Sequence, residues 1–250
     1  MKCDGMGKDI KIKLYGDGAN LEIMKQLYRD SVVSGFTTNP TLMKAAGVTD
    51  YKKFGKEAVR MMPDVPISFE VFSDDLSGME MEARNISSWG ANVYVKIPVT
   101  NTRGESTAPL IQRLARDGLK LNVTAILTIA QVREVAAALS PSVPSVVSIF
   151  AGRIADTGVD PVPTMAAARD ILAPNKSAEL LWASSREVIN ILQAESCGCH
   201  IITVTPEILK KLPMLGKDLT QLSLETVRMF YNDAKAAGLS LENSQLQDRS

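Results

Sequence analysis

Charged side chains interrupt short apolar segments of this chain near their C-terminal ends. Lys96 stands in Val-Tyr-Val-Lys-Ile-Pro, Glu70 in Ile-Ser-Phe-Glu-Val, and Asp17 follows Ile-Lys-Leu-Tyr-Gly. A lysine amine forms an iminium with a ketone and so supplies an electron sink for carbon–carbon cleavage without a metal. Carboxylates move the protons that this reaction needs. These residue types indicate Schiff-base chemistry, with Lys96 as the nucleophile and Asp17 and Glu70 as acid–base groups.

Amide, hydroxyl and guanidinium side chains recur at the ends of other apolar segments. They are Asn39, Asn122, Thr124, Ser148, Arg153, Ser184 and Arg186. Amides and hydroxyls hydrogen-bond a polyhydroxy chain, and the guanidinium fork fits phosphate oxygens. Each residue alone also has an ordinary structural interpretation, such as a turn at Asn39-Pro40 or a solvated surface cation. The functional interpretation accounts for all of them together and predicts a sugar-phosphate site.

Eight short apolar segments alternate with helical patterns. As strands they are expected at 11–16, 33–37, 67–72, 92–97, 120–125, 145–150, 179–184 and 200–204. This repeat predicts a parallel sheet wound by helices, and eight repeats in 250 residues favour a closed (β/α)8 barrel of the TIM type. An open doubly wound sheet is the alternative, but Gly16-Asp17-Gly18 is not its Gly-rich phosphate turn. The polar strand ends would then meet at the C-terminal face, where barrel active sites lie.

Residues two apart in a strand share a face. Asn92, Tyr94 and Lys96 are therefore expected on one face, and Val93, Val95 and Ile97 on the other. By the same rule Ser68 shares a face with Glu70, and Asn122 with Thr124. The apolar face is expected to meet the helices and the polar face to line the barrel mouth.

The chain shows no linker-like change in composition, so one barrel domain is expected over 1–250, with a polar tail from about residue 242. Thr128 and Thr164 stand where helix N-caps are expected. Acidic and basic residues number 28 each, which indicates no nucleic-acid partner. No apolar run is long enough to predict a membrane span.

The N-terminal residues 1–13 lack the apolar stretch of a signal peptide, and the three cysteines are an odd number. A cytoplasmic location is therefore expected. The segment Cys197-Gly-Cys199-His200 matches no common zinc spacing, so no metal site is predicted. No cofactor is expected either.

Several motifs occur in the order of a known family. They are GDGAN at 16–20, TTNP at 37–40, ISFEVF at 67–72, VKIPVT at 95–100, NVT at 122–124, SIFAGRI at 148–154 and WASSRE at 182–187. Through these motifs, from about residue 14 to 233, the chain resembles the transaldolase family. The resemblance is strongest to its short microbial branch, which includes the fructose-6-phosphate aldolases.

The resemblance implies a role for each residue. Lys96 would be the Schiff-base lysine on strand 4, Asp17 the acid–base group at the cleaved bond, and Glu70 with Thr124 the holders of a catalytic water. The positions implied for sugar binding are Asn39, Asn122 and Ser148, and those for phosphate binding are Arg153, Ser184 and Arg186.

The implied reaction moves a dihydroxyacetone unit from sedoheptulose 7-phosphate or fructose 6-phosphate to glyceraldehyde 3-phosphate or erythrose 4-phosphate, a step of the pentose phosphate pathway. The alternative is an aldolase that releases free dihydroxyacetone. Such relatives carry Gln where this chain has Glu70, and Tyr at the substrate-binding position where it has Phe150, so both positions favour transfer.

The family usually has Thr or Ser at position 18, Ser-Pro-Phe at 148–150 and a different 101–106 segment, which leaves open a specialised sugar pathway. A catalytically inactive barrel with a binding role is a further alternative, disfavoured by the full set of catalytic residues. Short relatives form decamers through C-terminal helices and longer ones form dimers, so the resemblance implies a homo-oligomer of either kind, with 219–237 as the candidate contact segment.

Overall fold

The computed structural model describes residues 10–239. The polar tail expected from about 242 lies outside the described residues. The described chain forms two compact units, residues 10–212 and 213–239, and all eight strands belong to the first. The expectation of a single domain over 1–250 stays a prediction.

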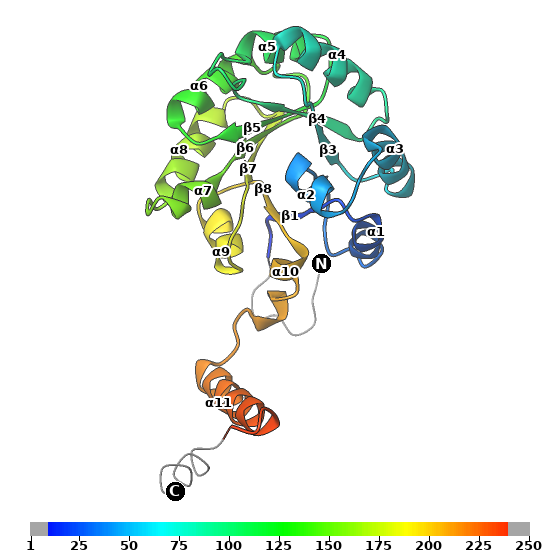
Figure 1. Cartoon of the computed structure of the whole chain (residues 1–250). Helices are drawn as coiled ribbons and strands as arrows, with labels where there is room; N and C mark the ends of the chain where they lie inside the picture. Colours follow the sequence, from blue (N-terminus) through cyan, green and yellow to red (C-terminus); the bar gives the residue numbers. More distant parts are fainter. Residues whose placement is uncertain (1–9, 240–250) are drawn as a thin grey trace, which may run out of the picture. The chain divides into compact units, whose positions relative to one another are not determined.

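The first unit is a closed barrel of eight parallel strands, in which each strand pairs with the next along the chain and β8 closes on β1 (Figure 1). The strands are β1 (Lys13–Asp17), β2 (Phe36–Thr37), β3 (Ile67–Glu70), β4 (Val93–Pro98), β5 (Leu121–Ile126), β6 (Ser145–Ile149), β7 (Ala178–Trp182) and β8 (Ile201–Val204). The predicted (β/α)8 barrel is therefore confirmed. The second strand is shorter than the expected 33–37 and keeps two residues.

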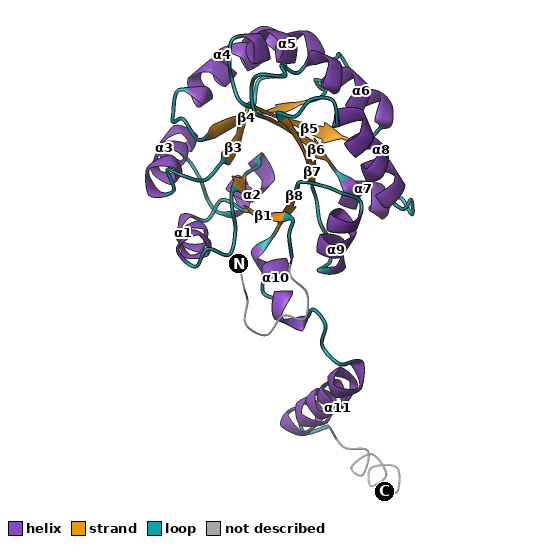
Figure 2. Cartoon of the chain, turned by 180° about the vertical axis from the view of Figure 1, so that it is seen from behind, coloured by secondary structure: helices purple, strands orange, loops and turns teal. Residues whose placement is uncertain are grey.

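Helices surround the strands, except that α2 lies over the open end of the ring in both views (Figures 1 and 2). The helices of this unit are α1 (Leu21–Arg29), α2 (Pro40–Ala45), α3 (Tyr51–Met61), α4 (Leu76–Ser87), α5 (Ala108–Arg116), α6 (Ile129–Ala138), α7 (Ala151–Asp156), α8 (Val162–Leu172), α9 (Ile189–Ser196) and α10 (Pro206–Leu209). A 3-10 turn, η1 (Leu212–Met214), and helix α11 (Leu219–Ala236) follow.

The alternation of side chains along β4 agrees with the expected faces. Val93, Val95 and Ile97 are at most 3% exposed and form part of the core. Tyr94 packs on a cluster drawn from β1, β6, β7 and β8, which includes Tyr15. A β4 side chain reaches those strands through the barrel interior, so the face that carries Tyr94 and Lys96 points inward.

Asn92 departs from this pattern, because it precedes the start of β4. Its Nδ2 donates to the carbonyls of Met62 and Val65, which ties together the loops before β3 and β4.

Of the two expected N-caps, Thr128 caps α6 in a capping box with Gln131, as predicted. Thr164 instead lies inside α8, which begins at Val162. Pro161 and Pro163 have fixed φ angles and no N–H, and Asp160 Oδ1 accepts from the Val162 N–H. The first turn of α8 thus forms without a threonine cap.

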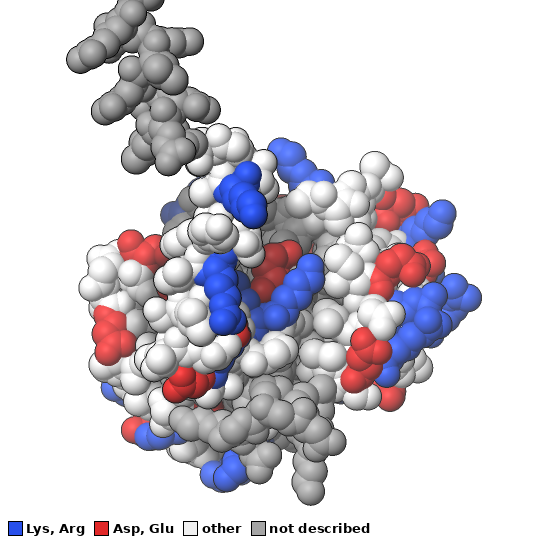
Figure 3. All heavy atoms as spheres, turned by 90° about the horizontal axis from the view of Figure 1, so that it is seen from below, with Lys and Arg blue, Asp and Glu red and all other residues white. Residues whose placement is uncertain are grey.

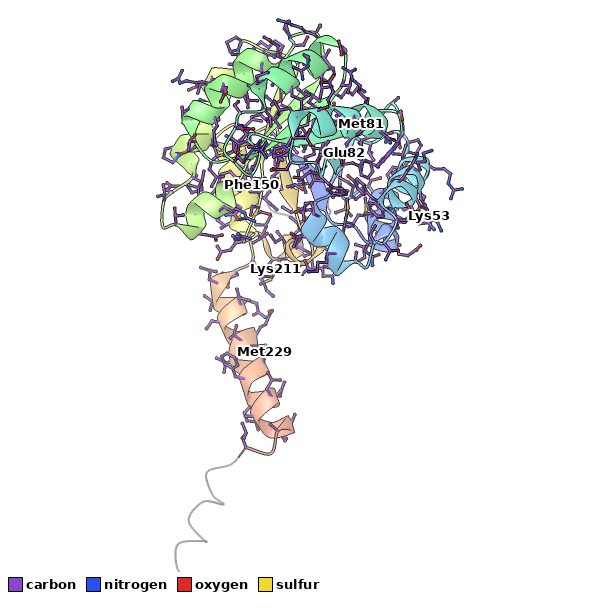
Figure 4. The ribbon with its side chains drawn as sticks, turned by 45° about the horizontal axis from the view of Figure 1, so that its top comes forward. Lys53, Met81, Glu82, Phe150, Lys211 and Met229 are labelled. Atoms are coloured by element: carbon purple, nitrogen blue, oxygen red, sulfur yellow. The ribbon has the colours of Figure 1, made fainter. Side chains whose placement is uncertain are left out.

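The second unit consists mainly of α11, which Asp218 caps by accepting from the Gln221 N–H. No residue of this helix is buried within the described chain. Phe230 and Tyr231 are 63% and 66% exposed, and Met229 is labelled in Figure 4. The helix therefore carries unpartnered apolar side chains.

No helix among residues 10–239 is long and apolar enough to cross a membrane. Basic and acidic side chains are interspersed on the face drawn in Figure 3.

Gly152, in α7, fixes the approach of this helix to the loop after β7. A Cβ at Gly152 would lie 1.6 Å from the Ser184 carbonyl oxygen. Ser184 has φ of 61°, so the backbone there already occupies the left-handed region. Neither α7 nor the loop after β7 can move aside without disturbing the other.

We expect Gly152→Ala to lower the free energy of unfolding by about 2–4 kcal/mol, because the added methyl group meets backbone rather than a flexible side chain. Urea denaturation measures the change. Gly18→Ala is the control, since a Cβ at Gly18 meets nothing within 4 Å. Equal stability of the two variants would contradict the close contact between α7 and the β7 loop.

Candidate active site

A cavity of about 420 Å³ opens at the C-terminal ends of the strands. Of the eleven site residues predicted from the sequence, ten line it: Asp17, Asn39, Glu70, Lys96, Thr124, Ser148, Phe150, Arg153, Ser184 and Arg186. Asn122 lies outside this lining. The residues come from every strand end from β1 to β7, so the barrel brings together groups that are far apart in the sequence.

Lys96 lies in the wall of the barrel and is 6% exposed. The parallel register pairs it with Glu70 on β3, and its Nζ lies 3.3 Å from Glu70 Oε2. The same Nζ donates to the Thr38 carbonyl at 3.0 Å. A buried amine needs such partners, because an unpaired charge or donor is costly away from water. These contacts hold the amine at the edge of the cavity.

Thr124 stands on β5, on the other side of Lys96 from Glu70. Its Oγ1 is fully buried and has no hydrogen-bond partner within residues 10–239. The β5–β6 register shifts between Val123 and Ile126, where Ala125 adopts φ of 60°. Strained backbone of this kind is concentrated at functional sites. Thr124 lines the cavity, and its hydroxyl is left without a hydrogen-bond partner among the described residues.

Asp17 ends β1, and its Oδ1 accepts a hydrogen bond of 2.8 Å from Thr37 Oγ1. The Thr37 hydroxyl also contacts that of Thr203 on β8. Burial raises the pKa of Asp17 above its usual range, while Lys96 and the Thr37 hydrogen bond act in the opposite direction. A raised pKa suits a carboxyl group that must both give and take a proton near neutral pH.

A layer of hydrogen-bonded side chains lies within the barrel at β3, β5 and β6. Asn122 Nδ2 donates to Ser68 Oγ at 2.9 Å, and Ser148 Oγ donates to Asn122 Oδ1 at 2.7 Å. Asn122 is fully buried, and both ends of its amide group are taken up by Ser68 and Ser148 rather than facing the cavity. It fixes Ser148, which does reach the cavity.

Asn39 was expected either in a turn before Pro40 or in sugar binding, and its side-chain amide offers one atom to each role. Its Oδ1 accepts from the Leu42 N–H and caps α2. Its Nδ2 amide group is left to donate toward the cavity that the residue lines. The helix N-cap thus determines which end of the amide a ligand meets.

Two arginines line the side of the cavity formed after β6 and β7. The Arg153 guanidinium lies 5.6 Å from the centre of the Phe150 ring, and Phe150 packs against the buried cluster that contains Tyr15 and Leu181. Arg186 pairs with Asp156. Ser184 lies between the two elements, in the left-handed turn described above. Together they give this end of the cavity a positive character.

Sequence reasoning missed the buried hydroxyl residues that support the charged groups, of which Thr37, Ser185 and Thr203 also line the cavity. Thr37, Thr38, Ser185 and Thr203 are buried and hold Asp17, Lys96 and the β8 backbone through hydroxyl or carbonyl groups. A signal existed for Thr203, a polar residue inside the apolar run Ile-Ile-Thr-Val, but threonine is also common in strands.

No group of three or more His, Cys, Asp and Glu side chains placed to bind a metal occurs in residues 10–239. Cys197 Sγ and Cys199 Sγ lie 3.5 Å apart as free thiols, and His200 Nδ1 accepts from the Leu180 N–H.

The fold and the cavity define a (β/α)8-barrel protein whose candidate site holds a buried lysine between polar strand ends. The family model described as Transaldolase/Fructose-6-phosphate aldolase matches residues 14–245. The chain belongs to this family.

Curated relatives agree with this assignment. A protein of Thermoanaerobacter sp. named probable transaldolase is 33% identical over 92% of this chain and 100% of its own length. Another of that name, from Roseiflexus castenholzii, is 35% identical over 86% of this chain and 94% of its own.

Solved structures show the fold alone. The 3-hexulose-6-phosphate synthase from Salmonella typhimurium matches with a TM-score of 0.56 and 16% identity, over 82% of this chain and 98% of that one.

The raised pKa of Asp17 predicts how stability depends on pH. A carboxyl group whose pKa is higher in the folded than in the unfolded state stabilises the fold while it is protonated, and this contribution is lost as the pH rises through the folded-state value. Asn has no charge to bury. We therefore expect Asp17→Asn to be more stable than the wild type at neutral pH, with a difference that shrinks as the pH falls.

Urea denaturation at a series of pH values tests this. Glu80→Gln is the control of opposite sign, because hydrogen bonds from Arg84 and Arg113 hold the pKa of Glu80 below its usual range. That variant should be less stable than the wild type at neutral pH and approach it in acid. A loss of stability in Asp17→Asn at neutral pH would contradict the burial of an ionised Asp17.

Proposed function

We propose that this protein is a transaldolase that transfers a dihydroxyacetone unit from a ketose phosphate to an aldose phosphate through a Schiff base on Lys96. The donor is sedoheptulose 7-phosphate or fructose 6-phosphate, and the acceptor is glyceraldehyde 3-phosphate or erythrose 4-phosphate. The observation that carries the proposal is the buried Lys96 amine, held 3.3 Å from Glu70 beside a cavity with two arginines. Membership of the family supports it.

In the first step the Lys96 amine attacks the ketose carbonyl, and the carbinolamine loses water to form an iminium. The proton transfers need a group that reaches the departing oxygen. Glu70 and Thr124 flank Lys96 on the neighbouring strands, and both line the cavity. A water held between the Glu70 carboxylate and the Thr124 hydroxyl relays the proton, since both groups accept hydrogen bonds.

In the second step Asp17 takes the proton of the hydroxyl group beyond the bond that breaks. The carbon–carbon bond electrons move into the iminium, an aldehyde leaves, and an enamine stays on Lys96. The acceptor aldehyde is attacked by this enamine, and Asp17 returns the proton to the new alkoxide. Hydrolysis of the iminium by the held water frees the product and Lys96. No step calls for a metal or a cofactor.

The substrate phosphate binds at Arg153, Ser184 and Arg186, at the end of the cavity formed by the segments after β6 and β7. The guanidinium groups supply charge-assisted hydrogen bonds, which are stronger than those between neutral groups. Asn39 and Ser148 bind the sugar hydroxyls, with Asn122 supporting Ser148 from below. Phe150 gives an apolar wall near the arginine it contacts.

The fructose-6-phosphate aldolase activity in the family's description is the second candidate, since it uses the same iminium. It differs after cleavage, because the enamine is protonated and released as dihydroxyacetone. Phe150 offers no hydroxyl to donate that proton, and the carboxylate of Glu70 binds the water more strongly than an amide would. Both residues support transfer.

We further propose a cytoplasmic homo-oligomer. The exposed apolar residues of α11, among them Val227, Phe230 and Tyr231, support a subunit contact, since large exposed apolar groups mark interaction sites. The free thiols of Cys197 and Cys199 are compatible with a reducing compartment.

We expect borohydride to trap a sugar adduct on Lys96 when the protein is incubated with fructose 6-phosphate, as peptide mass spectrometry will detect. Lys96→Met should lose the adduct and lower kcat by on the order of a thousandfold or more, since the covalent route is removed. Lys44→Met is the control, because Lys44 is an exposed lysine of the neighbouring helix α2. An adduct on another lysine, with Lys96→Met still active, would sink the proposal.

The balance between transfer and release tests the choice of reaction. With fructose 6-phosphate and an aldose phosphate the wild type should transfer quickly, and with fructose 6-phosphate alone it should release dihydroxyacetone slowly. Glu70→Gln combined with Phe150→Tyr should raise the ratio of release to transfer, because the water is held less firmly and a phenol supplies a proton. Coupled assays measure both rates. Wild-type release as fast as transfer would identify an aldolase instead.

A further inference from the structure

Asp156 is the last residue of α7 and lies outside the cavity lining, yet it contacts a residue within it. Arg186 Nε donates to Asp156 Oδ1 at 3.1 Å, and the NH2 nitrogen of Arg186 donates to Asp156 Oδ2. The carboxylate therefore occupies one whole edge of the guanidinium group. Such two-point pairs fix the plane of an arginine as well as its position.

The remaining donors of Arg186 follow from the shape of the guanidinium group. It carries five N–H groups, one on Nε and two on each terminal nitrogen. Asp156 takes the Nε–H and one N–H of NH2. One N–H of NH2 and both N–H groups of NH1 remain. Of these, the one on NH2 and one of those on NH1 lie side by side at the tip of the guanidinium group and point in the same direction. This free edge matches two oxygens of a phosphate.

The backbone of Arg186 is held separately. Asn190 Oδ1 accepts from the N–H groups of Arg186 and Glu187, at 2.8 and 3.0 Å. The contact of Gly152 with the Ser184 carbonyl sets the distance between α7, which carries Asp156, and the β7 loop, which carries Arg186. The long side chain is therefore the part of Arg186 that can still change conformation, and the hydrogen bonds to Asp156 restrict it.

Arg153 is held by a different contact. Its guanidinium group faces the Phe150 ring, and none of the ion pairs found in residues 10–239 includes it. Arg153 thus keeps its donors for a ligand, while Arg186 gives up two of them. The hydrogen bonds from Arg186, with a smaller contribution from the charge of Arg153, keep the pKa of Asp156 below its usual range, so the carboxylate stays ionised and the pair persists at neutral pH.

We propose that Asp156 is a positioning residue, which orients the Arg186 guanidinium so that its free edge meets the phosphate of the substrate. This rests on the proposed function for the identity of the substrate, and assigns to Asp156 no contact with phosphate or with the reacting atoms. Holding an arginine in its binding geometry before the ligand arrives avoids the entropy cost of ordering it on binding.

The test compares variants of Asp156 in the full-length protein. Asp156→Ala and Asp156→Asn should raise the Kd for inorganic phosphate, measured by calorimetry, and the KM for fructose 6-phosphate by about five- to tenfold, equivalent to about 1.0–1.4 kcal/mol. The kcat, and the kcat/KM for unphosphorylated fructose, should stay within about twofold of the wild type, since binding alone is lost. Unchanged activity on fructose also shows that the variants fold.

Two comparisons separate positioning through Arg186 from other effects. In an Arg186→Ala background, Asp156→Ala should cause no further loss, because its target is gone. Asp170→Asn is the matched control, since Asp170 accepts from Nε and NH2 of Arg169 in an exposed pair on α8, away from the cavity. It should leave phosphate binding unchanged.

Tighter phosphate binding in Asp156→Asn would show that the carboxylate competes with the ligand, and would overturn the inference. An equal loss from Asp156→Ala with and without Arg186 would overturn it as well. The phosphate measurement needs no turnover, so it is independent of the Schiff base. A normal Lys96 adduct with phosphate binding unaffected by Asp156→Ala would refute the inference alone, whereas the reverse result would refute the transaldolase proposal alone.

Discussion

The site is organised around one constraint, namely that the Lys96 amine is buried and must find polar partners inside the barrel. Glu70 lies 3.3 Å from it and the Thr38 carbonyl accepts its hydrogen bond. Removing one partner of a buried pair leaves the other without compensation, at a cost of about 3–5 kcal/mol. The ends of β2 and β3 are therefore fixed relative to β4, which holds the Lys96 amine at the edge of the cavity.

Parallel pairing extends that constraint around the barrel. The register aligns Glu70 with Lys96 and Lys96 with Asn122, so all three side chains point to the interior. Asn122 then joins Ser68 to Ser148, and each amide atom finds a partner. Buried polar groups need such complete networks, because any that remain unpaired destabilise the fold. The buried Thr124 hydroxyl is an exception and stands at the cavity, where a ligand can complete it.

The two arginines at one end of the cavity are held by different contacts. Arg153 lies against an aromatic ring and forms no ion pair within residues 10–239, while Arg186 gives one edge to Asp156. The close approach at Gly152 keeps their two elements together. The positive end of the cavity thus depends on a glycine and a carboxylate that do not themselves line it.

The sequence by itself determined the eight strands, the (β/α)8 class and nine polar residues of the cavity lining, because short apolar segments with polar ends are local signals. The family resemblance added Phe150. Tertiary structure decided the rest. Asn122 and Ser148 have the same polar, strand-end character in the sequence and both are buried, yet only Ser148 lines the cavity. Asp156 and Thr203 looked like ordinary helix and strand residues, since their partners Arg186 and Thr37 are distant in the chain. Which polar groups pair is set by register and helix approach, and those are properties of the closed barrel rather than of any one segment.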